Sequence, residues 1–370
     1  MIMFHRQFSL KAARQQGVAL IVVLLIIAMI AIVATNITSL NQLSVRRTIN
    51  MTQYDQAYWY ALSAEELAKK ILAQDFEDDD ESVNLQQYWA QSDMVFPVEL
   101  GEIAGEIKDM RSCFNVNALS VSTEEDASTG QTKTSLPMQQ FAGLLVAMGM
   151  DQFSADTLAA TLKDYTDEDT TTSSYGAEDA EYESRSVPYR AANTLLFDKS
   201  ELRAIMGFTQ DIYMRIAPFV CAIPGNDQQV LNVNTIKVEE AALLAGMFEN
   251  KISVGEAEGI INQRPANGYD SIDDFWSNSS ISSLKTSDEE LASSFVIDSD
   301  YFLLRAGAKV DRAIFRLKSV LMKGSDDKLS VISRQFGDRK IALPVKEDSS
   351  SFLSEEEKNG SFTKEPENKK

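Results

Sequence analysis

The sequence predicts an α+β fold in which a long N-terminal helix packs on a small antiparallel sheet and a large α-helical insertion interrupts that sheet. Three observations predict this fold. No Pro or Gly occurs between Val18 and Gln74, strand-like segments lie at 96–117 and from Ala313 onward, and helical periodicity dominates between the two strand regions.

The first element is an uncharged apolar segment behind a basic leader. The leader contains Arg6, Lys11 and Arg14 and no acid, and the apolar run extends from Val18 to Ala34. A run of this length is at the short end of what spans a bilayer, and the basic side of such a segment stays in the cytoplasm. The only evident small-residue cleavage point, at Gly17, precedes the apolar core, so we expect the segment to survive processing as a single-pass anchor.

Beyond the anchor, the same helix is expected to continue as a stalk. Ala, Leu, Glu and Lys are frequent from Ala57 to Ala73. Tyr54, Ala57, Ala61 and Ala64 fall on one helical face, which favours packing on the protein's own sheet over contacts with a partner. We extend this expectation to the neighbouring aromatic residues Tyr58, Trp59 and Tyr60.

The strand regions come next. Short apolar segments surround Gly101 and Gly105, and apolar residues alternate with basic ones from Ala313, as in a half-buried strand. A hairpin is predicted from Leu329–Phe336 and Lys340–Leu343 around the Gly337-Asp338 turn. Residues 346–370 are mostly Ser, Glu, Lys and Asn, and we predict a disordered tail there.

Between the strand regions, the periodicity predicts five helices, with Ser154 and Ser200 as N-caps. The helices are expected at 141–148, 155–162, 199–206, 239–247 and 255–262. The sequence Phe-Asn-Val-Asn at 114–117 is echoed by Leu-Asn-Val-Asn at 231–234, and each precedes a helical region. This echo indicates two related small units within the insertion.

Composition excludes several classes of function. The chain has 55 acids against 35 bases, a net charge of −20, and loss of the leader would leave 32 bases and −23. Such a charge disfavours binding of nucleic acid through a basic face. The single histidine, His5, lies in the leader, so the mature chain has neither a Ser-His-Asp triad nor a histidine metal ligand. We expect a protein that is not an enzyme.

The N-terminal pattern resembles that of type IV pilin-like prepilins. The resemblance rests on the leader ending in Gly17, the apolar run starting at Val18 and the unbroken helix into YDQAYWYALSAEELAKKIL at 54–72. In that family a membrane peptidase cuts after the Gly, so Gly17 and Val18 would flank the cut. Most such subunits have a Glu at the fifth mature residue, where this chain has Val22. Because that Glu neutralises the neighbouring subunit's amino terminus in the membrane, a subunit without it suits the end of a fibre.

The large size and several further segments resemble the K-class minor pseudopilins of the type II secretion system. These segments are CFNVNAL at 113–119 and the stretches at 164–182, 188–208, 217–224 and 231–247. The resemblance implies an inner-membrane protein with a periplasmic domain that caps a short fibre and limits its length. Its partners would be the I- and J-class minor pseudopilins and the prepilin peptidase, together with the major pseudopilin and secreted substrates, and no nucleic acid.

The resemblance also implies a domain plan with a pilin-like αβ body. The expected parts are a leader at 1–17, an anchor and stalk at 18–75, a body at 76–122 and 299–345, an inserted helical domain at 123–298 and a tail at 346–370. The insertion would contain helix-hairpin-helix or SAM-like units. The segment from Leu231 to Phe275 resembles a helix-hairpin-helix module, but its turn, 248–251, lacks the glycine-rich and basic character that binds phosphate, which favours a purely structural unit.

An acidic loop is the candidate metal site. Acids crowd the segment 164–183, with no base between Lys163 and Arg185, and calcium takes six to eight hard oxygen ligands. Asp167, Asp169 and Glu178 fall at positions 1, 3 and 12 of an EF-hand count, but position 6 is Thr172 where the turn of that motif needs Gly. The alternative is a solvated acidic loop. Resemblance to the K class favours structural calcium, with the ligands Asp164, Asp167, Asp169, Glu178 and Asp179.

The two cysteines, Cys113 and Cys221, are either a disulfide or two buried thiols. Each lies in a segment that resembles the K class, which favours the disulfide.

Two other functions remain open at this point. One is a minor pilin of a surface type IV fibre, and the other is a membrane-tethered nucleic-acid receptor built on the helix-hairpin-helix unit.

Overall fold

The structure, a computed structural model, describes residues 18–78, 82–91, 94–121, 134–324 and 327–337. Residues up to Gln56 and residues from Ala57 form two compact units, which we describe separately. The expected leader, the second strand of the predicted hairpin and the tail lie outside the described residues.

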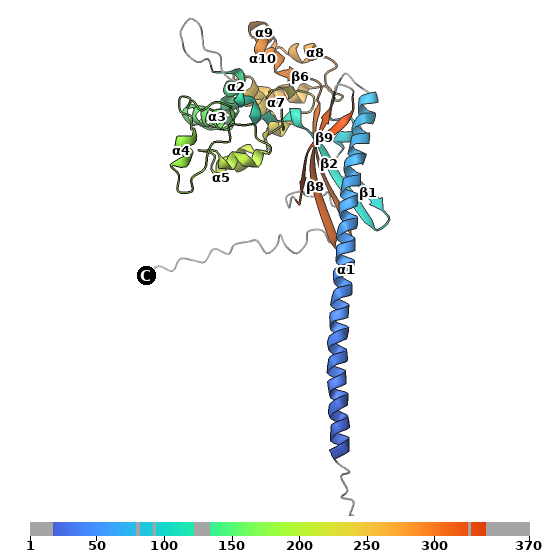
Figure 1. Cartoon of the computed structure of the whole chain (residues 1–370). Coiled ribbons are helices and arrows are strands. Elements are labelled where there is room, and N and C mark those ends of the chain that lie inside the picture. The colour runs from blue at the N-terminus through green and yellow to red at the C-terminus, as the bar shows by residue number, and fades with distance from the viewer. Residues whose placement is uncertain (1–17, 79–81, 92–93, 122–133, 325–326, 338–370) are drawn as a thin grey trace, which may run out of the picture. The chain divides into compact units, whose positions relative to one another are not determined.

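Helix α1 begins at Val18 and ends at Asp78 (Figure 1). Its first part, in the first unit, is exposed throughout its apolar run. Among the described residues it is the one helix that is long and apolar enough to cross a membrane. The helix extends beyond the expected boundary at residue 75, and Phe76 is buried in the core between the helix and the sheet.

In the second unit, α1 packs against a five-stranded antiparallel sheet with the order β1-β2-β7-β8-β9 (Figure 1). The strands are β1 (Met94–Val98), β2 (Gly101–Asp109), β7 (Tyr301–Val310), β8 (Ala313–Lys323) and β9 (Leu329–Phe336). The centre of the helix face that contacts the sheet is a row of small residues followed by one Leu: Ala57, Ala61, Ala64, Ala68 and Leu72. Small side chains at helical spacing allow the helix to lie close to the sheet.

The aromatic residues of the stalk behave differently from one another. Tyr58 packs against Phe315 and Phe336 from the sheet, with ring centroids 5.1 and 5.8 Å away, and Tyr60 is partly buried. Trp59, in contrast, is 61% exposed, so the expectation that it packs in the core is wrong. Its helical phase places it away from the alanine face, and no sheet residue covers it.

An ion pair with a buried carboxylate joins α1 to the edge strand β9 of the sheet. The carboxylate of Glu65 accepts hydrogen bonds from Arg334 of β9 at 2.6 and 2.9 Å and from the Ser319 hydroxyl of β8 at 2.5 Å. Burial raises the pKa of Glu65, but the hydrogen bonds from Arg334 and Ser319 outweigh burial and lower that pKa below its usual value.

The insertion between β2 and β7 is mainly helical. Its α-helices are α2 (Leu136–Ala147), α3 (Gln152–Thr166), α4 (Asp179–Glu183), α5 (Gln210–Ile216), α6 (Ala241–Met247), α7 (Val254–Gln263), α8 (Ile272–Trp276), α9 (Ser282–Ser287) and α10 (Glu289–Ser293). The insertion also contains the short 3-10 helices η2 (Met110–Ser112), η3 (Val116–Ser120), η4 (Lys199–Ala204) and η5 (Val238–Glu240), whereas η1 (Tyr88–Ala90) lies before β1. Four of the five predicted helices are present, whereas 199–206 forms the 3-10 helix η4.

Both predicted N-caps are wrong because an aspartate slightly earlier in the chain takes the position. Asp151 caps α3 by accepting a hydrogen bond from the Ser154 amide, and Asp198 caps η4 with Glu201 completing a capping box. An ionised carboxylate is at least as good an acceptor as a hydroxyl at a helix start, and its charge also favours the helix dipole.

The insertion also begins earlier than the expected residue 123. Phe114, Val116 and Leu119 are completely buried in the core formed by the helices. Two short parallel strand pairs complete the insertion. They are β3 (Phe114–Asn115) with β4 (Val220–Cys221), and β5 (Leu231–Asn232) with β6 (Phe295–Val296).

Two helical hairpins, α2–α3 and α6–α7, pack against each other and have the same turn. In the first, the amides of 148, 149 and 150 donate to the carbonyls of 144, 146 and 145. In the second, the amides of 248, 249 and 250 donate to the carbonyls of 244, 246 and 245. A Cβ on Gly246 would lie 2.5 Å from the Leu144 backbone, so glycine is needed for this contact. The two related units indicated by the sequence echo are therefore present.

The disulfide and a buried aspartate lie where the insertion leaves the sheet. Cys113 and Cys221 form a disulfide, with Cα atoms 5.8 Å apart, next to the end of β2. Asp109, the last residue of β2, is buried and accepts hydrogen bonds from Thr235 and Asn232 of the insertion and from Ser299 just before β7. Burial raises the pKa of Asp109 in spite of these hydrogen bonds. The chain thus leaves and re-enters the sheet at one point.

Candidate metal centre

The acidic loop connects α3 to α4, so the candidate ligands lie between two helix ends. Asp167 is the C-cap of α3, Asp169 follows in the loop, and Glu178 is the N-cap of α4. Asp164 lies in the last turn of α3, and Asp179 is the first residue of α4. The 12-residue spacing of the EF-hand count therefore separates two helices, as it does in that motif.

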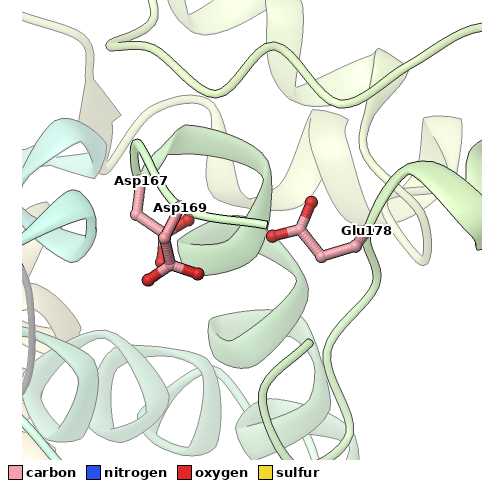
Figure 2. Close-up of side chains that lie close together, drawn as sticks. All are labelled: Asp167, Asp169 and Glu178. Carbon is pink, nitrogen blue, oxygen red and sulfur yellow. The ribbon is translucent and has the colours of Figure 1, made fainter. Parts of the chain in front are cut away.

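Three of the five candidate ligands come together. One carboxylate oxygen from each of Asp167, Asp169 and Glu178 lies within 4.8 Å of the others. Figure 2 shows the Glu178 carboxylate pointing toward the two aspartates from the opposite side. Asp167 and Glu178 are buried, and Asp169 is exposed, so the group opens to solvent on one side.

The remaining two candidates lie beside this group. The Asp164 carboxylate accepts a hydrogen bond from the Ser173 amide at 2.9 Å, and its other oxygen is buried without a partner. The Asp179 carboxylate accepts a hydrogen bond from the Ala191 amide at 3.0 Å and lies 3.8 Å from Arg190. Asp179 thus holds the following segment, and the structure does not bring it into the group of three.

Four buried carboxylate oxygens around the centre have no hydrogen-bond partner among the described residues. They are Asp164 Oδ1, Asp167 Oδ1, Glu178 Oε1 and Glu178 Oε2. Buried polar atoms in folded proteins are almost always paired, and a carboxylate left without a partner costs more than a neutral group does. This arrangement is therefore unfavourable unless a proton or a cation binds to it.

The electrostatics of the centre agree with this conclusion. Burial, followed by repulsion from Asp164, Asp167, Asp169 and Asp179, raises the pKa of Glu178 to about 7. Burial also raises the pKa of Asp164 and of Asp167. The base Lys163 is buried and contacts the second oxygen of Asp167 at 2.5 Å, and it neutralises only part of the charge.

The loop makes its sharp turn later than an EF-hand does. Position 6 is Thr172, and the turn instead forms at Tyr175, whose φ is +68°, and Gly176, whose amide donates to the Ser173 carbonyl. A Cβ on Gly176 would lie 1.9 Å from an oxygen of Asp164. The glycine is therefore needed for the loop to fold over the Asp164 carboxylate.

Asn193 contributes to the site without having been predicted. Its side-chain amide donates to the Asp169 carbonyl at 2.8 Å, its own amide donates to the Tyr165 carbonyl, and its Oδ1 atom is buried without a partner. Its φ is +43°, a conformation that Asn tolerates better than most residues. No spacing connects Asn193 to the acidic loop, so only this backbone preference could have singled it out.

The donor set fits a hard divalent cation. All the converging atoms are oxygens, most of them buried carboxylate oxygens lacking another partner, and calcium prefers such ligands in flexible geometry. No histidine occurs beyond residue 5 and both cysteines are in the disulfide, so the nitrogen and sulfur ligands typical of zinc sites are missing from the centre.

The groups of the helix-hairpin-helix turn, 248–251, form hydrogen bonds within the insertion. Asn250 donates a hydrogen bond from its side chain to the Gly143 carbonyl, and the backbone amides of the turn bond to the end of α6. Glu249 and Asp288 both form ion pairs with Lys251. The amides that would bind a phosphate are thus used within the insertion, in agreement with a structural role.

Two protein-family models match the chain, and both are described as type II secretion system (T2SS) protein K. One matches residues 112–225 and the other residues 231–298. Together they cover the insertion, from the disulfide to the strand β6.

Individual proteins resemble the chain over nearly their whole length. The type II secretion system protein K of Aeromonas hydrophila is 40% identical over 328 residues, covering 88% of this chain and 98% of that protein. The protein of the same name from Pectobacterium carotovorum subsp. carotovorum is 35% identical over 334 residues, covering 90% and 99%.

A solved structure also matches. A chain in the crystal structure of the GspK-GspI-GspJ complex from the enterotoxigenic Escherichia coli type 2 secretion system superimposes with a TM-score of 0.69 and 31% identity. The match covers 79% of this chain and 99% of that one.

Proposed function

Because this chain belongs to the type II secretion system protein K family, a non-enzymatic family of minor pseudopilins, we propose that it caps the tip of the periplasmic pseudopilus. In this position it would support protein secretion across the outer membrane and limit the length of the fibre. The relatives and the family models favour this machine over a surface type IV pilus or a nucleic-acid receptor.

The observation that carries the proposal is the match to the E. coli complex. That structure contains GspI and GspJ together with GspK, and this chain covers 99% of the matched chain. We propose by analogy that the partners of this chain are the I- and J-class minor pseudopilins. The absence of an acid at Val22 supports an end position, because the chain offers no carboxylate to the amine of a following subunit.

The anchor supports an inner-membrane location with the folded part in the periplasm. The apolar run of helix α1 is exposed and therefore available to lipid. Trp59, exposed on the stalk, offers an aromatic contact for a neighbouring helix.

Calcium is the proposed structural cofactor. Asp167, Asp169 and Glu178 would hold it, with Asp164 and backbone or water oxygens completing the shell. Bound calcium would neutralise the buried carboxylates and tie the C-terminal end of α3 to the start of α4. Its role would be to stabilise this part of the insertion.

The first test is to express the full chain with and without a prepilin peptidase and to determine its amino terminus. The second is to co-purify the processed chain with tagged I- and J-class partners. We expect a peptidase-dependent start at Val18 and recovery of both partners. An uncut chain, or a cut beyond Ala34, would remove the capping mechanism, and a processed chain that recovers neither partner would overturn the proposed assembly.

A further inference from the structure

A groove lies on the face of the sheet opposite α1, between β7, β8 and β9 and the segment that leads into η4. Two adjoining cavities of about 260 and 450 Å³ form it, and Asp198, Lys199, Arg305, Lys318 and Gln335 line both. It is separate from the candidate metal centre, with which it shares no lining residue.

The groove is basic in a strongly acidic protein. Its lining has five bases, Lys108, Lys199, Arg203, Arg305 and Lys318, against three acids, Asp109, Asp198 and Glu240. The three acids already have partners. Asp109 accepts hydrogen bonds at the end of β2, Asp198 pairs with Lys318, and Glu240 pairs with Lys108 at 2.7 Å.

Three of the five bases have carboxylate partners as well. Lys108 pairs with Glu240, Lys318 pairs with Asp198, and Arg305 pairs with Glu106 at 3.0 Å. Arg305 of β7 and Lys318 of β8 also stand directly opposite each other in the sheet register, so positive charge is concentrated on this face.

Lys199 is repelled by the other bases of the groove. Its ammonium donates to the carbonyls of Ala217 and Val220, and no carboxylate of the described residues forms an ion pair with it. Burial, followed by repulsion from Arg305, Lys108 and Lys318, lowers the pKa of Lys199 to about 8. A carboxylate in the groove would compensate this repulsion.

The rim of the groove adds aromatic surface. Phe197 lines the smaller cavity and is 50% exposed, whereas the Phe336 ring points to the other face of the sheet and packs against Tyr58 of α1. A ligand that combines an apolar side chain with carboxylates would therefore match both properties of the groove.

The chain itself contains such a segment within reach. The last described residue, Gly337, lines the groove and is held there by a hydrogen bond from its amide to the Arg316 carbonyl. The sequence from Glu347 to Glu357 has five acids and no base, and it contains Phe352 and Leu353. Phe352 lies 15 positions after Gly337, a distance along the chain that spans at most about 50 Å, so the tether reaches the groove and keeps the local concentration of the segment high.

We infer that the groove binds the chain's own acidic segment 347–357, with Phe352 or Leu353 against Phe197 and the glutamates beside Arg203 and Lys199. The occupied groove would join the sheet to the η4 part of the insertion. This inference does not depend on the proposed secretion function.

The test uses the full chain with a photo-reactive benzoylphenylalanine in place of Phe352, and mass spectrometry of the cross-linked peptides. An equal mixture of light and isotope-labelled chains separates cross-links within one chain from those between two copies. We expect cross-links within one chain to residues 197–203 and 333–337. The same probe at Phe362, outside the acidic segment, is expected to give at least about fivefold less, because Lys358 and Lys364 flank it and the basic groove repels them.

Two exposed arginines provide matched variants. Arg203→Glu, in the groove, should reduce the cross-link at least about threefold, since it replaces attraction by repulsion, whereas Arg312→Glu, at the β7–β8 turn, should not. Combining Arg203→Glu with Glu356→Arg should restore the yield, which a mere loss of folding would not allow.

Three results would overturn the inference. Cross-links that form only between light and heavy chains would identify a second copy as the occupant. Equal cross-link yields from the probes at Phe352 and Phe362 would contradict the inference, and so would equal effects of the two arginine variants.

Discussion

Asn117 and Asn234 perform the same task in the two halves of the insertion. Asn117 Oδ1 accepts a hydrogen bond from the Leu196 amide at 2.8 Å, and its Nδ2 donates to the Leu196 carbonyl at 2.9 Å. Asn234 Oδ1 accepts from the Tyr269 amide at 2.7 Å, and its Nδ2 donates to the Tyr269 carbonyl at 3.0 Å. Each asparagine therefore pairs with both backbone groups of one distant residue, as a neighbouring strand would.

This equivalence predicts equal sensitivity. Asn117→Ala and Asn234→Ala should each lower the free energy of unfolding by about 2 to 4 kcal/mol, because two backbone groups in a buried site lose their partner. Denaturant unfolding of the full chain in detergent would measure it. Asn262→Ala, on the exposed side of α7, is the control and should change the value by less than about 0.5 kcal/mol. Variants as stable as this control would contradict the interpretation.

The disulfide is expected to form during folding and to contribute to stability. Thiol titration of the unfolded, unreduced protein should detect no free thiol, and two titratable thiols would refute the bond between Cys113 and Cys221. Replacing both cysteines by alanine should lower the free energy of unfolding by about 4 to 5 kcal/mol on the chain-entropy model, since the bond closes a loop of 108 residues.

Calcium should stabilise the chain, and a chelator should destabilise it. At a free calcium concentration of about 100 times its dissociation constant, the gain is about 2.7 kcal/mol, and the melting temperature should rise by several degrees. Asp167→Asn and Glu178→Gln should remove this response, whereas Glu168→Gln, at an exposed neighbour of the site, should retain it. Wild-type melting that is the same in calcium and in chelator would exclude a structural metal.

The stability of the calcium-free protein should fall as the pH rises from 5 to 8. The pKa of Glu178 is raised from 4.5 to about 7 in the folded state, so the folded protein binds this proton more tightly than the unfolded chain does. The resulting stabilisation is complete below the unfolded pKa and disappears as the pH passes through about 7. Melting in chelator across this range is the measurement, and Glu178→Gln should flatten the dependence. A wild-type protein that becomes more stable with rising pH would contradict it.

Val22 should decide where the subunit lies in the fibre. Val22→Glu supplies the carboxylate that pairs with the amine of another subunit, so we expect the variant to enter positions below the tip and to alter fibre length. Labelling of the subunit on isolated fibres and a secretion assay would measure this, with Val22→Leu as the control. Unchanged fibre length and secretion would count against the end-of-fibre argument.

Much of the fold could be predicted because its signals are local. The apolar run from Val18 and the alternation from Ala313 each need only a few neighbouring residues, and both predicted elements are present. The 12-residue spacing from Asp167 to Glu178 was likewise enough to single out the three carboxylates that lie together in the structure. Non-local properties were missed. The exposure of Trp59 depends on what the sheet covers, and the hydrogen bond from Asn193 to Asp169 joins residues 24 positions apart.

The single point at which the insertion leaves and re-enters the sheet has a consequence for the order of folding. Asp109 at the end of β2 stands opposite Phe302 of β7, so the whole insertion is, in topological terms, the loop of a β-hairpin. Closing a disordered loop of this length costs roughly 4 to 5 kcal/mol of chain entropy. An insertion that folds first brings its two ends together and removes this cost. The strands then meet like those of a short hairpin, and the helical insertion acts as the template on which the sheet is nucleated.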